Sequence, residues 1–123
     1  MKQLPTWVEK YNKKISKYTS DQISYSPVGN EVTIDMAKNV ISNEKLGQQG
    51  ETDMLCVSFS STDKIGHKYG THCQIIQDQF VDLDKRLADF FNYLDQTIGK
   101  DEYLVFLTAD HGAANNILMN TRY

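Results

Sequence analysis

A long amphipathic segment between two short apolar runs constrains the fold of this chain most strongly. Residues 54–60 (MLCVSFS) and 103–108 (YLVFLT) are nearly continuous in apolar character, which is typical of strands buried on both faces of a parallel sheet. Over residues 72–98 apolar side chains recur at helical spacing, and Gly99 follows as a stop. The order strand, helix, strand predicts a right-handed βαβ unit over about residues 54–111.

The remaining sequence predicts helices and polar connectors. Apolar residues at helical spacing predict helices over residues 5–18 and 33–46. Polar, turn-forming residues predict connectors at 19–30 and 47–53. A length of 123 residues suits one domain over residues 1–123, and the fold class expected for it is α/β.

Each apolar run is followed by an aspartate and a histidine. Asp63 and His67 come after the first run, and Asp110 and His111 come after the second. Parallel strands end at the same edge of a sheet, where open α/β folds bind their ligands, so these side chains are expected to converge. Carboxylates and imidazoles suit zinc. Two such pairs predict a two-metal site that could clamp the attacking and leaving oxygens of a displacement at phosphorus.

Composition argues against several other classes of function. The net charge is −3 and the basic residues form no stripe, so nucleic-acid binding is not expected. No apolar run approaches the roughly 18 residues that a membrane span needs. The N-terminal residues MKQLPTWVEK lack the apolar core of a signal peptide. Two cysteines do not make a disulfide framework.

Two motifs, SSTDKIGHKYG at residues 60–70 and FLTADHG at residues 106–112, resemble the alkaline phosphatase superfamily. The likeness is strongest to PafA-type alkaline phosphatases and type I phosphodiesterase/nucleotide pyrophosphatases, and it extends from about Leu4 to Gly112. It implies part of a three-layer sandwich around a mostly parallel sheet. It also implies hydrolysis of phosphate monoesters or diesters through a covalent phospho-enzyme, with two zinc ions.

The resemblance assigns metal ligands by position. Asp63 and His67 match two ligands of one zinc, and Asp110 and His111 match two ligands of the other. Counterparts of the nucleophilic Thr or Ser, of a third histidine ligand and of the substrate-clamping Lys and Arg are not found in the sequence. The chain is therefore expected to be a fragment with no catalytic residue of its own, inactive alone and weak in zinc binding.

Further expectations follow for the parent protein and its alternatives. The parent would act on a small phosphate ester and, by resemblance, would be periplasmic or exported. An incomplete sheet would leave apolar faces uncovered, so self-association of the fragment is expected. Two alternatives remain open: a sulfatase-like or phosphoglycerate-mutase-like member of the same superfamily, or a non-catalytic interaction domain in which the metal residues are relics.

Overall fold

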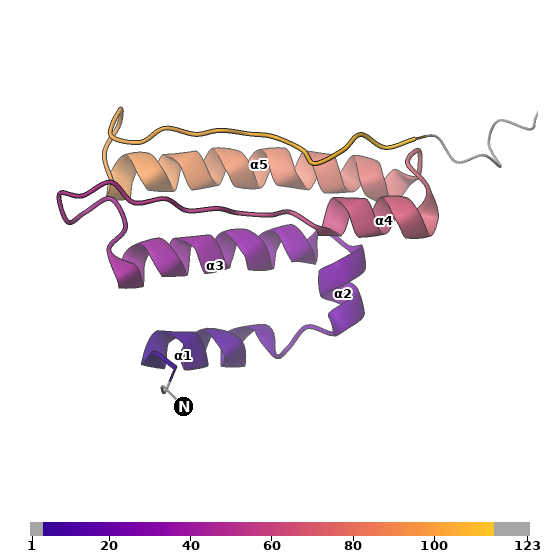
Figure 1. Cartoon of the computed structure of the whole chain (residues 1–123). Helices are drawn as coiled ribbons and strands as arrows, with labels where there is room; N and C mark the ends of the chain where they lie inside the picture. The colour runs from indigo at the N-terminus through magenta and orange to yellow at the C-terminus, as the bar shows by residue number, and fades with distance from the viewer. Residues whose placement is uncertain (1–3, 115–123) are drawn as a thin grey trace, which may run out of the picture.

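The computed structural model describes residues 4–114. In this range the helices pack together, and two extended segments run alongside the long helices α3 and α5 (Figure 1). Helix α3 contacts α1, α2 and α5, while α4 contacts α2 and α5. The helices are α1 (Thr6–Ile15), α2 (Ser20–Tyr25), α3 (Val28–Glu44), α4 (Ser61–Tyr69) and α5 (Gln74–Thr97).

The hydrophobic core lies between α3 and α5. Its buried members are Ile34, Ala37 and Ile41 from α3, and Phe90 and Leu94 from α5. These positions follow the helical spacing predicted for both segments, because residues three and four apart share one face of a helix. Partly buried residues from the flanking segments complete the cluster: Leu46, Val57, Phe59, Tyr93, Ile98 and Tyr103.

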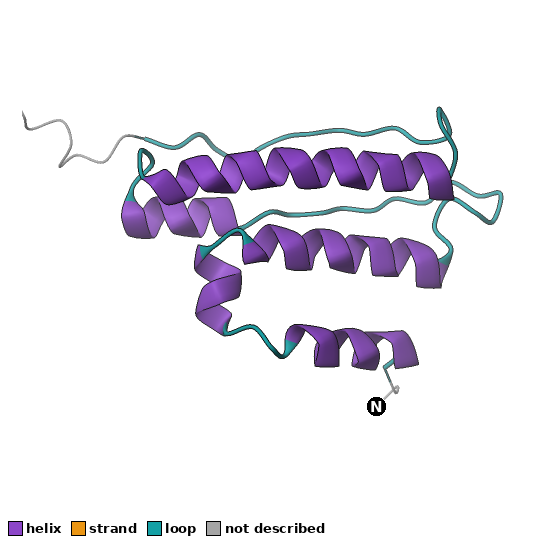
Figure 2. Cartoon of the chain, turned by 180° about the vertical axis from the view of Figure 1, so that it is seen from behind, coloured by secondary structure: helices purple, strands orange, loops and turns teal. Residues whose placement is uncertain are grey.

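The predicted α/β fold, with a βαβ unit on a mostly parallel sheet in a three-layer sandwich, is wrong for the described residues. Residues 4–114 contain no strand, and Figure 2 shows only helices and loops there. The apolar runs 54–59 and 103–109 are extended but lie in no paired ladder. A strand exists only through backbone hydrogen bonds to a neighbouring strand. Residues 4–114 contain no such ladder of backbone hydrogen bonds.

The two extended segments leave large apolar side chains in solvent. Met54 is 87% exposed, Leu104 78%, and Phe106 and Leu107 84% each. Val57, Phe59 and Tyr103 instead pack against the α3–α5 core. The runs are therefore anchored on the helices by part of their side chains only. That residues 1–123 are a fragment of one domain stays a prediction, and the two ends of this range lie outside the described residues.

The helices match the sequence predictions unevenly. Helices α1 and α5 lie within the predicted segments 5–18 and 72–98. Helix α3 begins five residues earlier than predicted, at Val28 instead of Thr33. Within the described part of the chain, no helix combines the length and the apolar character needed to cross a membrane.

Two short helices, α2 and α4, were not predicted, and α2 lies in a segment predicted as a connector. Helix α2 begins with a capping box, in which the Thr19 hydroxyl accepts from the Gln22 backbone N–H and the Gln22 side chain accepts from the Thr19 backbone N–H. The spacing Thr-x-x-Gln is a sequence sign of such a start. Helix α4 has one fully buried apolar side chain, Ile65, so its segment offers few apolar positions from which a helix could be predicted.

Candidate metal centre

Helix α4 displays the first predicted pair on one face. Asp63 lies in its first turn and His67 in its last turn, four residues apart and therefore on the same side of the helix. The opposite face holds the helix in place, because Ser61 and Ile65 are buried. Asp63 Oδ1 lies 3.3 Å from His67 Nε2.

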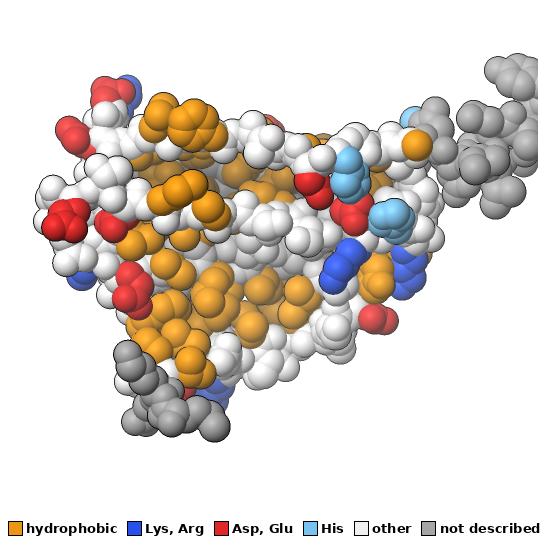
Figure 3. Space-filling view, in the orientation of Figure 1, with side chains coloured by type: hydrophobic (Ala, Val, Ile, Leu, Met, Phe, Trp, Pro, Cys, Tyr) orange, Lys and Arg blue, Asp and Glu red, His pale blue; other side chains and the backbone are white. Residues whose placement is uncertain are grey.

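The second extended segment carries the other pair to the same place. This segment runs beside α5 towards α4 (Figure 1). Its end places His111 Nε2 3.7 Å from Asp63 Oδ1 and 3.8 Å from Asp110 Oδ2. Figure 3 shows histidine and acidic side chains gathered at this end of the molecule, with basic side chains beside them. The four residues singled out in the sequence therefore form one cluster, although their role as metal ligands stays a prediction.

The cluster is open to solvent. The exposed fractions of the side chains are 49% for Asp63, 79% for His67, 56% for His111 and 92% for Asp110. The pKa of His111 lies above its ordinary value, first because its ring hydrogen-bonds to the Gly112 carbonyl oxygen and then because Asp110 and Asp63 are near. The distance from His111 Nδ1 to that oxygen is 2.8 Å. In the neutral ring this contact makes Nδ1 the protonated nitrogen and leaves Nε2 free to bind a cation.

The donor chemistry of the cluster fits zinc, while the number of donors around one point is low. Two ligands of a tetrahedral zinc, each about 2.1 Å from the ion, lie about 3.4 Å apart, close to the Asp63–His67 separation of 3.3 Å. Nevertheless, among the described residues no group of three or more His, Cys, Asp or Glu side chains is placed to hold an ion. The arrangement thus fits two ligands per ion, an incomplete coordination shell.

Two lysines flank the cluster and are held by residues of α2. Lys64 Nζ donates to Ser24 Oγ at 3.4 Å. Lys68 Nζ lies 4.1 Å from the centre of the Tyr25 ring and 5.1 Å from that of Tyr69. The contribution of Ser24 and Tyr25 was missed in the sequence, because they lie some forty residues from the motif, in a segment predicted as a connector. The two ammonium groups add positive charge beside the two carboxylates of the cluster.

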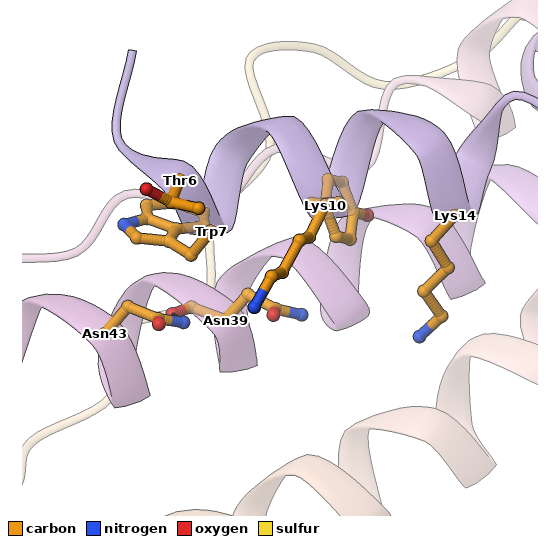
Figure 4. A pocket seen from close by; sticks show the side chains of 7 residues that line it. Thr6, Trp7, Lys10, Lys14, Asn39 and Asn43 are labelled. Carbon is orange, nitrogen blue, oxygen red and sulfur yellow. Dashed lines mark hydrogen bonds between the residues drawn. The ribbon is translucent and has the colours of Figure 1, made fainter.

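A separate hollow of about 570 Å³ lies between α1 and α3 and contains none of the four cluster residues. Figure 4 shows Lys10 reaching towards the asparagines of α3, with Lys14 further along α1. Lys14 pairs with Asp35, and the Trp7 indole N–H donates to Glu44 at 2.7 Å. Several polar groups of this hollow are thus engaged within the chain. Its lining residues are Thr6, Trp7, Lys10, Tyr11, Lys14, Asn39 and Asn43.

Comparison with known proteins establishes the family. Residues 3–121 match the Type I phosphodiesterase / nucleotide pyrophosphatase family. The chain is 57% identical over 89 residues to the alkaline phosphatase PhoV of Synechococcus elongatus, covering 72% of this chain and 16% of that protein. It is 45% identical over 95 residues to the alkaline phosphatase PafA of Elizabethkingia meningoseptica, covering 77% and 17%. The chain therefore belongs to the Type I phosphodiesterase / nucleotide pyrophosphatase family, within the alkaline phosphatase superfamily.

A solved structure supports the same relationship. The crystal structure of wild-type alkaline phosphatase PafA superimposes with a TM-score of 0.88 at 30% sequence identity. The match covers 98% of this chain and 33% of that chain. The chain thus spans about a sixth of the length of the two curated relatives and corresponds to part of a phosphatase domain.

Proposed function

We propose that this chain carries part of the zinc site of a phosphatase or phosphodiesterase that hydrolyses small phosphate esters. The observation that supports the proposal is the convergence of Asp63 with His67 and His111, together with Asp110 beside His111. In this assignment Asp63 and His67 hold one zinc, and Asp110 and His111 hold the other. Bound zinc would polarise the phosphoryl group and stabilise charge on the attacking and leaving oxygens.

Other residues of the chain would orient the His111 ring and balance the negative charge of the substrate. The Gly112 carbonyl fixes the tautomer of His111 through Nδ1 and presents Nε2 to the cation. Lys64 and Lys68 would attract the anionic phosphate ester to this end of the molecule. Their tethers on Ser24 and Tyr25 hold the two ammonium groups near α4.

By itself the chain is expected to bind zinc weakly and to be inactive. Two donors per ion fall short of the three or four protein ligands of zinc sites. In addition, we find no counterpart in this sequence of the Thr or Ser that acts as the nucleophile in the family. Hydrolysis would belong to a longer parent protein, which we place in the periplasm or outside the cell by its likeness to alkaline phosphatases. The family match favours this assignment over a sulfatase-like or mutase-like protein.

Zinc titration by calorimetry tests the proposal. The measurement is made at about pH 8, because zinc competes with protons for its ligands. It uses the wild-type chain and a variant with Asp63→Ala and Asp110→Ala. Weak binding that disappears in the variant is the expected result. The matched control carries Asp84→Ala and Asp89→Ala, two exposed positions on α5, and should bind as the wild type does. Equal zinc binding by all three proteins would refute the assignment.

An activity assay tests the expected inactivity. The chain, saturated with zinc, is incubated with p-nitrophenyl phosphate and with bis-p-nitrophenyl phosphate. Release of nitrophenol at the rate of the buffer blank is expected, because a displacement at phosphorus needs a positioned nucleophile as well as the metal. Turnover that Asp63→Ala abolishes would show instead that the chain is a complete catalyst.

A further inference from the structure

We propose that a buried amide pair, Asn30 and Gln79, positions the first turn of α4 so that Asp63 and His67 face His111. Asn30 and Gln79 would be positioning residues, acting through Thr62, and neither would touch the metal. The inference rests on the proposed zinc-binding role of the cluster. It adds the residues of α3 and α5 that hold the cluster's geometry.

The amide pair is completely buried and reaches α4 directly. Asn30 and Gln79 are both 0% exposed. Gln79 Nε2 donates to Asn30 Oδ1 at 2.9 Å and to Thr62 Oγ1 at 3.3 Å. Thr62 immediately precedes Asp63. One amide nitrogen thus links α3, α5 and the residue next to the first candidate ligand.

The burial of Gln79 departs from the amphipathic pattern of α5. Phe80 is one of the apolar residues that recur at helical spacing over residues 72–98, yet it is 56% exposed, whereas Gln79 is buried. Burying a primary amide is costly unless it gains hydrogen bonds. Gln79 Oε1 has no hydrogen-bond partner among the described residues, so the burial leaves part of that cost uncompensated. A polar side chain that replaces an apolar one here therefore points to a specific task, and its bonds lead to α4.

A network of polar side chains on α3 and α5 holds Asn30 and Gln79 in place. Asn30 Nδ2 donates to the Gln79 carbonyl oxygen and to Asp82 Oδ2, both at 3.4 Å. Asp82 accepts from Arg86 Nε at 2.8 Å, and Arg86 also pairs with Glu31 at 3.3 Å. These bonds tie the start of α3 to the first half of α5. Bonds between α3 and α5 therefore hold the two amides in place.

A second contact fixes the neighbouring residue of α4. Ser61 Oγ donates to the Ile23 carbonyl oxygen of α2 at 3.0 Å and lies against Gly29 of α3. Successive residues of a helix point about 100° apart, so holding both Ser61 and Thr62 fixes the rotation of α4 about its axis. The direction of the next residue, Asp63, is then determined.

The cluster needs such support because its own side chains are largely exposed to solvent. Asp63 is 49% exposed and His67 is 79% exposed, and exposed side chains are held weakly by their own contacts. Residues that orient metal ligands from outside the coordination shell commonly change affinity by about 10–100-fold when they are replaced. We expect about tenfold here, since the amides act through the helix backbone.

The test compares substitutions that remove the contact with others that keep it. Thr62→Val removes the hydroxyl that accepts from Gln79, whereas Thr62→Ser keeps it. Gln79→Met removes the buried amide at similar volume, and Gln77→Met makes the same change at an exposed position of α5. Zinc affinity is measured by calorimetry, and urea unfolding reports the stability of each variant.

A second readout does not depend on zinc. Asp63→Cys and His111→Cys are introduced with Cys56→Ser and Cys73→Ser, and the rate of disulfide formation between positions 63 and 111 reports how often they meet. Thr62→Val and Gln79→Met should lower zinc affinity about tenfold and slow the cross-link several-fold. Thr62→Ser and Gln77→Met should leave both unchanged.

The outcomes separate this inference from the proposed function. Absence of zinc binding in the wild type would refute the metal role, and the cross-linking rate would then decide the positioning role alone. Cross-linking in Thr62→Val and Gln79→Met at the wild-type rate would overturn the inference. So would an equal loss in Thr62→Ser, since that variant keeps the hydrogen bond. If Gln79→Met does not fold, Thr62→Val against Thr62→Ser decides the question.

Discussion

Replacing Gly29 by alanine is predicted to destabilise the protein, although alanine is the better helix former. Gly29 is the second residue of α3, where α3 meets α2 and α4. A Cβ at this position would lie 1.8 Å from Ser61 Oγ, 2.9 Å from Ser61 Cβ and 2.4 Å from the Ile23 carbonyl oxygen. The serine hydroxyl can rotate away. The Ile23 carbonyl belongs to the backbone, so relief requires α2 or α4 to move.

The size of the effect follows from three contributions. Overpacking of a tight contact costs about 1–3 kcal/mol. Loss of the Ser61–Ile23 hydrogen bond adds about 1 kcal/mol. The better helix propensity of alanine offsets about 1 kcal/mol. The net expectation is a free energy of unfolding lower by about 1–3 kcal/mol.

Urea unfolding followed by circular dichroism at 222 nm measures this change. With an m-value of about 1.5 kcal/mol/M, a loss of about 2 kcal/mol lowers the midpoint by about 1.3 M. Gly66→Ala is the matched control, because the nearest atom to its added Cβ is Thr71 Cγ2 at 4.0 Å. That variant should gain about 0.5–1 kcal/mol. A Gly29→Ala protein as stable as the wild type would refute the argument from close packing.

Two further predictions concern stability at high pH and association. Burial, with Asp35 and Glu31 nearby, raises the pKa of Tyr11 to about 12. The contribution of this shift to the free energy of unfolding, at most about 3 kcal/mol, is complete below about pH 10 and lost as the pH rises through 12. Tyr11→Phe should remove this part of the alkaline decline in the urea-unfolding free energy, and an unchanged decline would contradict the prediction. The exposed side chains of Leu104 and Phe106 predict that the protein self-associates at micromolar concentrations. Sedimentation velocity should show less association in a variant with Leu104→Ser and Phe106→Ser. A wild-type protein that stays monomeric would contradict this prediction.

Local patterns in the sequence were sufficient for the long helices and for the choice of candidate residues. Apolar spacing located α5, and Gly99, with a φ of 125°, follows its end as predicted. The Asp-x-x-x-His and Asp-His motifs singled out the four residues that the structure brings within 3.3–3.8 Å of one another in successive pairs. The helical spacing and each of the two motifs involve residues close together in the chain, so they can be recognised in the sequence alone.

Only the tertiary structure decided the state of the apolar runs and the surroundings of α4. Residues 54–59 and 103–109 have the composition of strands, but pairing needs a second backbone, which the described residues do not supply. Likewise, Gln79 is polar in sequence yet buried in the structure, because its partners Asn30 and Thr62 come from other helices. Backbone pairing and the burial of polar side chains both depend on contacts between segments far apart in the chain. Such contacts cannot be predicted from the local periodicity of the sequence.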